Sequence, residues 1–156
     1  MSTLETCLWF NGQAEAAAAF YVSVFRNAKL LGTTYFPEGL PQPAGSVLTV
    51  RFSLDGMVFT ALNGGPQYSL TPAISFVVTC ESQAEIDDHW QKLTEGGEEA
   101  PCGWLKDRFG VSWQIVPKGL MELLDGPDKA ASQRAVQAML QMKKLDIAAL
   151  RRAYDA

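Results

Sequence analysis

The chain has 156 residues, of which 13 are basic and 17 acidic, so its formal charge at neutral pH is −4. Its hydrophobic share of 47% and charged share of 19% are typical of a folded globular protein and exclude a disordered one. The acidic balance argues against nucleic-acid binding, which needs clustered lysines and arginines. No stretch approaches 18 uncharged apolar residues, so we expect no membrane span.

The beginning of the chain and its cysteines predict a cytoplasmic protein. Residues 1–5 lack the basic and apolar stretches of a secretory signal. Three scattered cysteines, Cys7, Cys80 and Cys102, do not make a disulfide framework, and an odd number is typical of a reducing compartment. Cys102 lies in a turn-like Pro-Cys-Gly-Trp segment, where we expect a structural role.

The first half of the chain predicts the element order β-α-β-β-β. An alanine-rich helix with an apolar stripe spans residues 13–25. Asp55-Gly56 is a hairpin signal, because both central positions of a type I′ turn need positive φ. Prolines and glycines make residues 37–45 a loop. The strand patterns cover residues 4–10, 29–36, 46–54 and 57–63.

The same order of elements recurs in the second half. Gln13-Ala14-Glu15 returns as Gln83-Ala84-Glu85, an offset of 83 − 13 = 70, and the turn glycines Gly56 and Gly110 are 54 apart. The sequence therefore predicts an α+β fold of paired βαβββ modules. The elements of the second half are a strand at 73–80, a helix at 83–94, interrupted strand material at 99–106 and a strand at 111–117.

Helical patterns fill the remainder of the chain. They cover residues 120–124, a segment from Asp128 to about 143, and residues 146–154, with Asp128 and Asp146 as N-caps. Met139 and Met142 of the middle segment are consistent with gap-filling in a core and with a partner surface. The predicted boundaries are a first module at 1–66, a second module at 67–117 and a helical extension at 118–156.

Several segments of the chain form a set of motifs in a fixed order: Leu8–Glu15 with Phe20-Tyr21, Ala61–Pro66, Ala73–Phe76, Cys102–Asp107, Phe109–Gln114 and the C-terminal stretch Met139–Leu150. In this order they resemble the PhnB-like branch of the vicinal oxygen chelate superfamily, which includes glyoxalase I, extradiol dioxygenases and antibiotic-resistance proteins. Some members of this branch carry the name of a demethylubiquinone methyltransferase, but the sequence has no glycine-rich loop between strand and helix of the kind that holds a methyl donor.

The resemblance implies a half-open cleft with metal-ligand positions on the first and last strand of each module. Carried over by motif, these positions fall at Thr6, at Thr60, at Ile74 or Phe76, and at Gln114. Hydroxyl, apolar and amide side chains are a poor set for a catalytic divalent ion, so we expect no metal and no other cofactor. The single histidine, His89, lies in a helical, acidic segment, where a solvated position is expected.

The resemblance further implies that the cleft is mainly apolar, with a few hydrogen-bonding groups, and a filled core is the alternative. An open cleft predicts binding of a small, largely apolar or aromatic metabolite, with Lys106 placed to meet an anionic tail. Two other functions stay open: an enzyme of the superfamily (lyase, isomerase or oxidoreductase) that uses Glu5, Cys102 or a substrate-completed metal, and a dimeric accessory protein acting through its C-terminal helices. We expect a homodimer. The expected cleft residues are Thr6, Leu8, Thr60, Leu62, Phe76, Trp104, Lys106 and Gln114.

Overall fold

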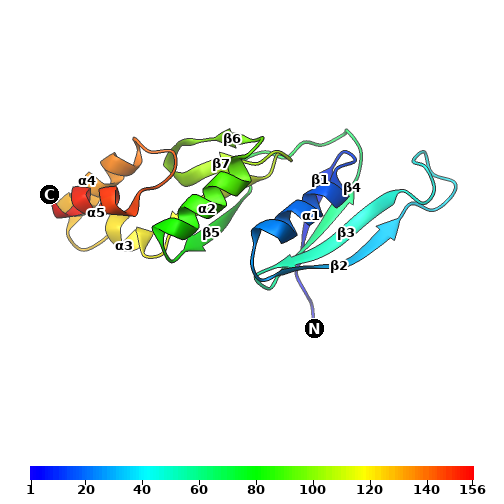
Figure 1. The fold of residues 1–156 in the computed structure, drawn as a ribbon, viewed down its shortest axis with the longest axis horizontal. Helices are drawn as coiled ribbons and strands as arrows, with labels where there is room; N and C mark the ends of the chain where they lie inside the picture. Colours follow the sequence, from blue (N-terminus) through cyan, green and yellow to red (C-terminus); the bar gives the residue numbers. More distant parts are fainter. The chain divides into compact units, whose positions relative to one another are not determined.

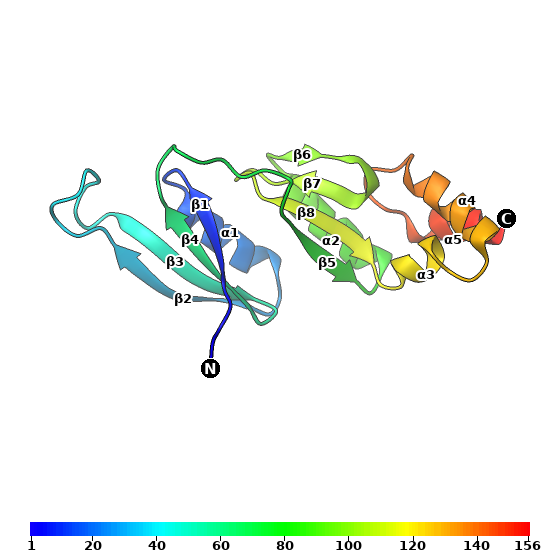
Figure 2. The same ribbon diagram turned by 180° about the vertical axis from the view of Figure 1, so that it is seen from behind.

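The computed structural model describes residues 1–156 as two compact units, Met1–Leu70 and Thr71–Ala156. Each unit is built on its own four-stranded sheet, and each sheet carries a helix on one face. Figure 1 shows α1 and α2 in front of their strands, and Figure 2, from behind, shows the strands in front of the helices. Each sheet therefore has a covered face, which packs against the helix, and an open face.

Unit 1 has the predicted β-α-β-β-β order. The strand order in the sheet is β1-β4-β3-β2, with β1 parallel to β4 and the other pairs antiparallel. Asp55 and Gly56 have φ values of 48° and 83°, so the predicted positive-φ turn joins β3 to β4. The elements are β1 (Thr6–Phe10), α1 (Ala14–Val24), β2 (Ala28–Tyr35), β3 (Val47–Leu54) and β4 (Met57–Asn63).

The core of unit 1 lies between α1 and the covered face of its sheet. Tyr21 of α1 stacks on Phe52 at 5.9 Å between ring centroids, and Phe52 stacks on Phe59 at 5.2 Å. The buried alanines of α1, Ala17 and Ala18, let the helix approach these rings closely. Burying each large apolar side chain contributes about 1.5–3 kcal/mol, so these contacts fix which sheet face is covered.

Unit 2 repeats the same topology and then adds helices. Its strand order is β5-β8-β7-β6, with β5 parallel to β8, as in unit 1. This repetition confirms the predicted α+β fold of two βαβββ modules. The repeated elements are β5 (Ser75–Cys80), α2 (Gln83–Thr94), β6 (Glu98–Glu99), a 3₁₀ turn (Pro101–Gly103), β7 (Trp104–Lys106) and β8 (Ser112–Pro117).

The C-terminal helices begin where predicted, but the middle one ends early. Asp128 and Asp146 cap their helices by accepting bonds from Ala131 N and Ala149 N. The second helix ends at Met139, not at about 143, because the chain turns there with a bond from Met142 N to Met139 O. The helices are α3 (Leu120–Leu124), α4 (Lys129–Met139) and α5 (Ile147–Asp155).

These helices form a small core of their own inside unit 2. Met139 and Met142 pack against a buried cluster that includes Leu145 and Leu150, so both methionines fill gaps in that core. Val116 of β8 packs against the same cluster, which joins the helices to the sheet. None of the helices combines the length and the apolar character needed to cross a membrane.

Polar contacts from α2 also hold the C-terminal segment. The Gln83 amide donates to Leu145 O at 3.0 Å and accepts from Ile147 N at 2.8 Å. Lys144 lies 2.8 Å from Asp87, and hydrogen bonds from Lys144 and Gln83 hold the pKa of Asp87 below its usual value. The helical extension therefore belongs to the same compact unit as the second module.

Asn63, at the end of β4, caps α1 from outside the helix. Its Oδ1 accepts from Ala14 N at 2.9 Å, while Gln13, at the N-cap position, makes no side-chain capping bond. Its Nδ2 donates to Val47 O at 3.0 Å. One side chain thus links the helix, β3 and β4.

We predict that Asn63→Ala lowers the free energy of unfolding of unit 1 by about 1–2 kcal/mol, because a helix cap and a part-buried hydrogen bond are both lost. Asn63→Asp should lose less, since it keeps the acceptor for Ala14 N. Urea unfolding followed by circular dichroism measures the change. Asn11→Ala, at an exposed position, is the control, and equal stability of N63A and N11A would contradict the prediction.

Candidate functional site

The strand register identifies the side chains on each open face. Residues paired across neighbouring strands point to the same side of a sheet. In unit 1, Thr60 pairs with Cys7 on one side and Arg51 on the other, and these three residues form row 1. In unit 2, Gln114 pairs with Val77 and Trp104, which together form row 2.

Rows 1 and 2 occupy equivalent positions in the two modules. Cys7 and Val77 are 77 − 7 = 70 residues apart, and Thr60 and Gln114 are 114 − 60 = 54 apart. These are the offsets of the repeated helix motif and of the turn glycines. The repeat therefore places a cation, Arg51, in one module where the other has an aromatic ring, Trp104.

Five of the eight expected cleft residues lie on open faces. Thr60 and Leu62 are on the open face of unit 1, and Trp104, Gln114 and Lys106 are on that of unit 2. The other three, Thr6, Leu8 and Phe76, lie on covered faces.

The register explains why those three residues are elsewhere. Thr6 pairs with the buried Phe59, and Leu8, only 5% exposed, pairs with Ala61. Phe76 packs on Trp113 with ring centroids 5.5 Å apart. A strand reverses its faces at each residue, so Cys7, not Thr6, lies beside Thr60, and Val77, not Ile74 or Phe76, lies beside Gln114.

Row 2 presents neutral hydrogen-bonding groups beside apolar surface. Gln114 Nε2 donates to Ser75 Oγ at 2.9 Å, which leaves the Gln114 side-chain oxygen directed to other partners. Val77 is 57% exposed, and Lys106, farther along the same face, pairs with Glu98 at 3.5 Å.

The Trp104 indole differs from the other three indoles of the chain. Trp9 Nε1 donates to Gly65 O, Trp90 Nε1 to Glu99 and Trp113 Nε1 to the buried Asp107, at 2.8–2.9 Å. Trp104 is partly exposed, and its indole N–H has no acceptor within the chain. An indole N–H normally finds a partner, so this donor is open to water or a ligand.

Row 1 is polar and charged. Arg51 forms an ion pair with Glu5, which lies just before β1. Desolvation raises the pKa of the Cys7 thiol, so the thiol stays protonated at neutral pH. A protonated thiol is a poor nucleophile, and the row has no base to activate it.

Glu5 and Cys102, the two residues considered for catalysis without a resident metal, both have partners within the chain. Glu5 is held by Arg51, as described. Cys102 has a φ of 63°, and its backbone N–H donates to Met142 O at 2.8 Å while its thiol contacts Met139 O at 3.7 Å. Cys102 thereby links the 3₁₀ turn to the end of α4, which is a structural role.

The donor chemistry of the two rows does not fit a divalent metal. The positions that the resemblance implies, Thr6, Thr60, Ile74 or Phe76, and Gln114, offer hydroxyl, apolar and amide groups. The side chains that the register brings together in the rows are a thiol, a hydroxyl, a valine and an amide, at Cys7, Thr60, Val77 and Gln114. No group of three or more histidine, cysteine, aspartate or glutamate side chains is placed to hold a metal ion. His89 Nδ1 lies 2.9 Å from Glu85 O on α2, the helix on the covered face of the unit 2 sheet, and so is not part of row 2.

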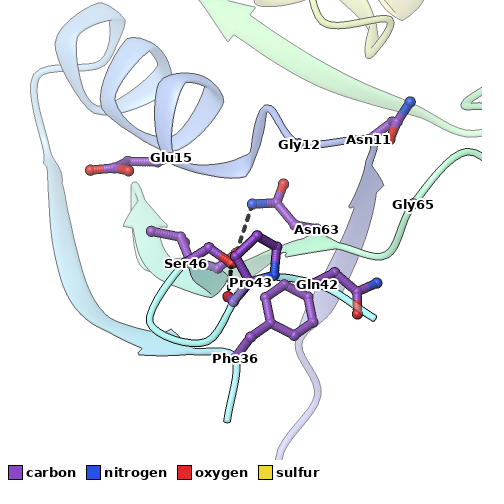
Figure 3. A pocket seen from close by; sticks show the side chains of 10 residues that line it. Asn11, Gly12, Glu15, Phe36, Gln42, Pro43, Ser46, Asn63 and Gly65 are labelled. Carbon is purple, nitrogen blue, oxygen red and sulfur yellow. Dashed lines mark hydrogen bonds between the residues drawn. The ribbon is translucent and has the colours of Figure 1, made fainter. Parts of the chain in front are cut away.

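A pocket of about 340 Å³ lies in unit 1 where the proline-rich loop meets the turn between β1 and α1. Asn63 stands at its centre but is committed to the fold through Ala14 and Val47. Figure 3 shows Glu15 and Asn11 on opposite sides of the opening, with side chains directed away from each other. The polar groups therefore do not converge on one point, and the sequence had not indicated this pocket.

Arg51 and Cys7 were also missed from the sequence, although a signal was present. The hairpin turn at Asp55-Gly56 pairs Leu54 with Met57, and counting back three pairs reaches Arg51 opposite Thr60. The repeat offset of 70 likewise links Cys7 to Val77. The pairing of parallel strands β1 and β4, which no turn connects, had no comparable signal.

The fold is shared with solved structures of the glyoxalase type. The fosfomycin resistance protein FosX from Listeria monocytogenes is 15% identical, with a TM-score of 0.54 over 78% of this chain and 97% of that chain. A protein from Pseudomonas aeruginosa is 22% identical, with a TM-score of 0.62 over 75% and 98%. At these identities the likeness shows the fold alone.

A closer relationship identifies the family. A PhnB protein from Bacillus cereus, described as a 3-demethylubiquinone-9 3-methyltransferase, is 33% identical, with a TM-score of 0.68 over 74% of this chain and 99% of that chain. Residues 2–116 match the family described as 3-demethylubiquinone-9 3-methyltransferase. The chain belongs to this PhnB-like family of the vicinal oxygen chelate superfamily. No curated protein matches it.

We predict that Cys7 in the folded protein reacts with iodoacetamide at neutral pH more slowly than in the denatured protein, because its raised pKa keeps the thiolate fraction low. The rate should rise as the pH is raised above 9.0, the ordinary pKa of a cysteine thiol. Peptide mass spectrometry measures the rate at each cysteine, and Cys7→Ser assigns the signal. Faster labelling of Cys7 in the folded protein would contradict the prediction.

Proposed function

We propose that this protein binds a small, largely apolar or aromatic metabolite on the open face of unit 2, without a catalytic metal. The observation that carries the proposal is the Trp104 indole, whose N–H has no acceptor within the chain. Beside it, the Gln114 side-chain oxygen is an acceptor and Val77 supplies apolar surface. A donor, an acceptor and a flat ring fit a ligand with a carbonyl or hydroxyl group on an aromatic body.

The family name is consistent with that ligand class. A demethylubiquinone ring is flat and conjugated, becomes aromatic on reduction to the quinol, and carries oxygen substituents of the kind that Trp104 and Gln114 would orient. Methyl transfer itself finds less support, because both sheets mix parallel and antiparallel pairs and neither contains a strand, glycine-rich loop and helix of the dinucleotide-binding type. We therefore favour ligand binding over methyl transfer.

Metal-dependent chemistry is the remaining alternative within the superfamily. FosX has been crystallised with Mn(II). In this chain rows 1 and 2 include a valine and a protonated thiol, which do not suit Mn(II). An enzyme of this superfamily would need ligands from the substrate to complete such a site.

We predict that Trp104→Ala weakens binding by about 2 kcal/mol and Gln114→Leu by about 0.5–1.5 kcal/mol, through loss of the ring contact and of one neutral hydrogen bond. A thermal-shift screen of aromatic carbonyl and hydroxyl compounds, including quinones, supplies the ligand, and calorimetry measures the affinity. Gln137→Leu on the exposed side of α4 is the matched control. Unchanged affinity in W104A and Q114L, with normal folding, would place the site elsewhere.

We also propose that the protein is a homodimer. Apolar side chains at Leu30 and Tyr35 of the edge strand β2 are 54% and 58% exposed, and a partner would remove them from water. Met139 and Met142 are used inside unit 2, which leaves Leu140 as the exposed apolar residue of that segment.

Sedimentation equilibrium tests the dimer. We expect a species of twice the monomer mass, and we expect Leu30→Lys with Tyr35→Lys to shift the equilibrium toward monomer, because a charge in an apolar interface is costly to desolvate. Leu140→Lys serves as the comparison on unit 2. A monomer-sized species at all assayed concentrations would contradict the proposal.

A further inference from the structure

The open face of unit 1 carries more positive charge than the chain as a whole. Arg51 lies in row 1, and Lys29 of β2 pairs with Ser53 two residues along β3, so both cations point to this face. Glu5 is the acid that neutralises part of this charge. The whole chain has a net charge of −4, whereas this face carries two cations and one acid that is already paired.

The neighbours of Arg51 on the open face carry hydroxyl groups. Thr60 is its neighbour in row 1, and Thr49 and Ser53 flank it on β3. Thr49 Oγ1 and Thr34 Oγ1 already share a hydrogen bond of 2.6 Å, whereas the Thr60 and Ser53 hydroxyls have no partner within the chain. Arginine together with hydroxyl donors is the arrangement that recognises carboxylate and phosphate oxygens.

Space is available beside this cation. Gly32 is the partner of Arg51 on β2, and no atom lies within 4 Å of the position that a Cβ at Gly32 would occupy. The side chains of Arg51 and Glu5 are 47% and 34% exposed. An exposed ion pair of this kind contributes only about 0.2–1 kcal/mol, so another anion can displace Glu5.

We infer that row 1 is an oxyanion-binding site, in which Arg51 with the Thr60 hydroxyl binds a carboxylate or phosphate group and Glu5 is the internal counter-ion that the ligand displaces. The site differs in chemistry from row 2, which is neutral and aromatic. Because it stands on the residues of unit 1 alone, it does not depend on the function proposed for unit 2.

Titration of the ¹⁵N-labelled protein with inorganic phosphate, and separately with acetate, at constant ionic strength tests this inference. We expect saturable shifts of the Arg51 Nε–Hε signal and of the Thr60 amide. Tighter binding of phosphate would indicate a tetrahedral ligand group, and tighter binding of acetate a carboxylate. Equal shifts at all exposed cations, or none at Arg51, would overturn the inference.

Variants separate a site from general charge attraction. Arg51→Met should abolish the shift of the Thr60 amide, and Arg51→Lys should weaken binding, because the bidentate fork is lost while the charge remains. Glu5→Gln should tighten binding about two- to fivefold by removing the competitor. Glu81→Gln makes the same charge change at the Lys118–Glu81 pair in unit 2 and should leave the affinity unchanged.

Equal gains in E5Q and E81Q would show that only net charge matters and would overturn the inference. The amide spectrum of R51M checks that unit 1 remains folded. Loss of phosphate binding in R51M, with unchanged shifts from an aromatic ligand at Trp104, would leave the two sites distinct. Aromatic binding without any phosphate binding would reject row 1 and keep row 2.

Discussion

The parallel pairing of β1 with β4, and of β5 with β8, determines what each open face presents. In each module the first strand lies against the last, and a shift of one residue would exchange the covered and open faces of the first strand. Packing fixes the register, because Leu8 and Phe10 on β1 are buried on the side where α1 stacks its own apolar residues. Cys7 and Trp9 are consequently on the other side, together with Thr60 and Leu62.

The same scaffold gives the two modules different chemistry. The topology, the register and the offsets agree between the halves, yet row 1 contains a thiol, a hydroxyl and a guanidinium, and row 2 contains valine, an amide and an indole. Central positions of the covered faces are apolar in both modules, as at Phe59 and Trp113, because they pack against a helix. The open-face positions have no such requirement, so they are free to differ.

The sequence was sufficient for the order of elements and for the helix caps. Alternation, the Asp55-Gly56 turn and the aspartate caps are local signals, and the structure has each of them. The end of α4 was harder to predict, because residues 140–143 have a composition typical of a helix. The turn that ends the helix is held in part by tertiary bonds: the backbone N–H groups of Cys102 and Gly103 donate to Met142 O and Lys143 O, and no local pattern records these bonds.

The sequence predicts which side chains share a sheet face where a hairpin joins the two strands. It does not do so where a longer crossover connects them. Trp104, Gln114 and Lys106 follow from the β7–β8 pairing, and they do share one face. The first strand of each module reaches its partner through a helix and two further strands, so counting along the chain leaves its phase undetermined. That gap accounts for the position of Thr6, Leu8 and Phe76 on covered faces, one residue out of phase with the open face.

The polar side chains of this protein fall into two groups: those whose hydrogen bonds maintain the fold, and those that remain able to bind a ligand. Asn63 and Asp107 have every oxygen engaged by the chain itself: Asn63 caps α1, and Asp107 accepts from Phe109 N, Val111 N and Trp113 Nε1. Such fully satisfied groups maintain the modules. Trp104, Gln114, Thr60 and Ser53 retain hydrogen-bonding capacity on open faces, which the fold does not consume. Because fold alone does not define activity, these unsatisfied groups, rather than the shared βαβββ framework, are where the chemistry of this protein is to be sought.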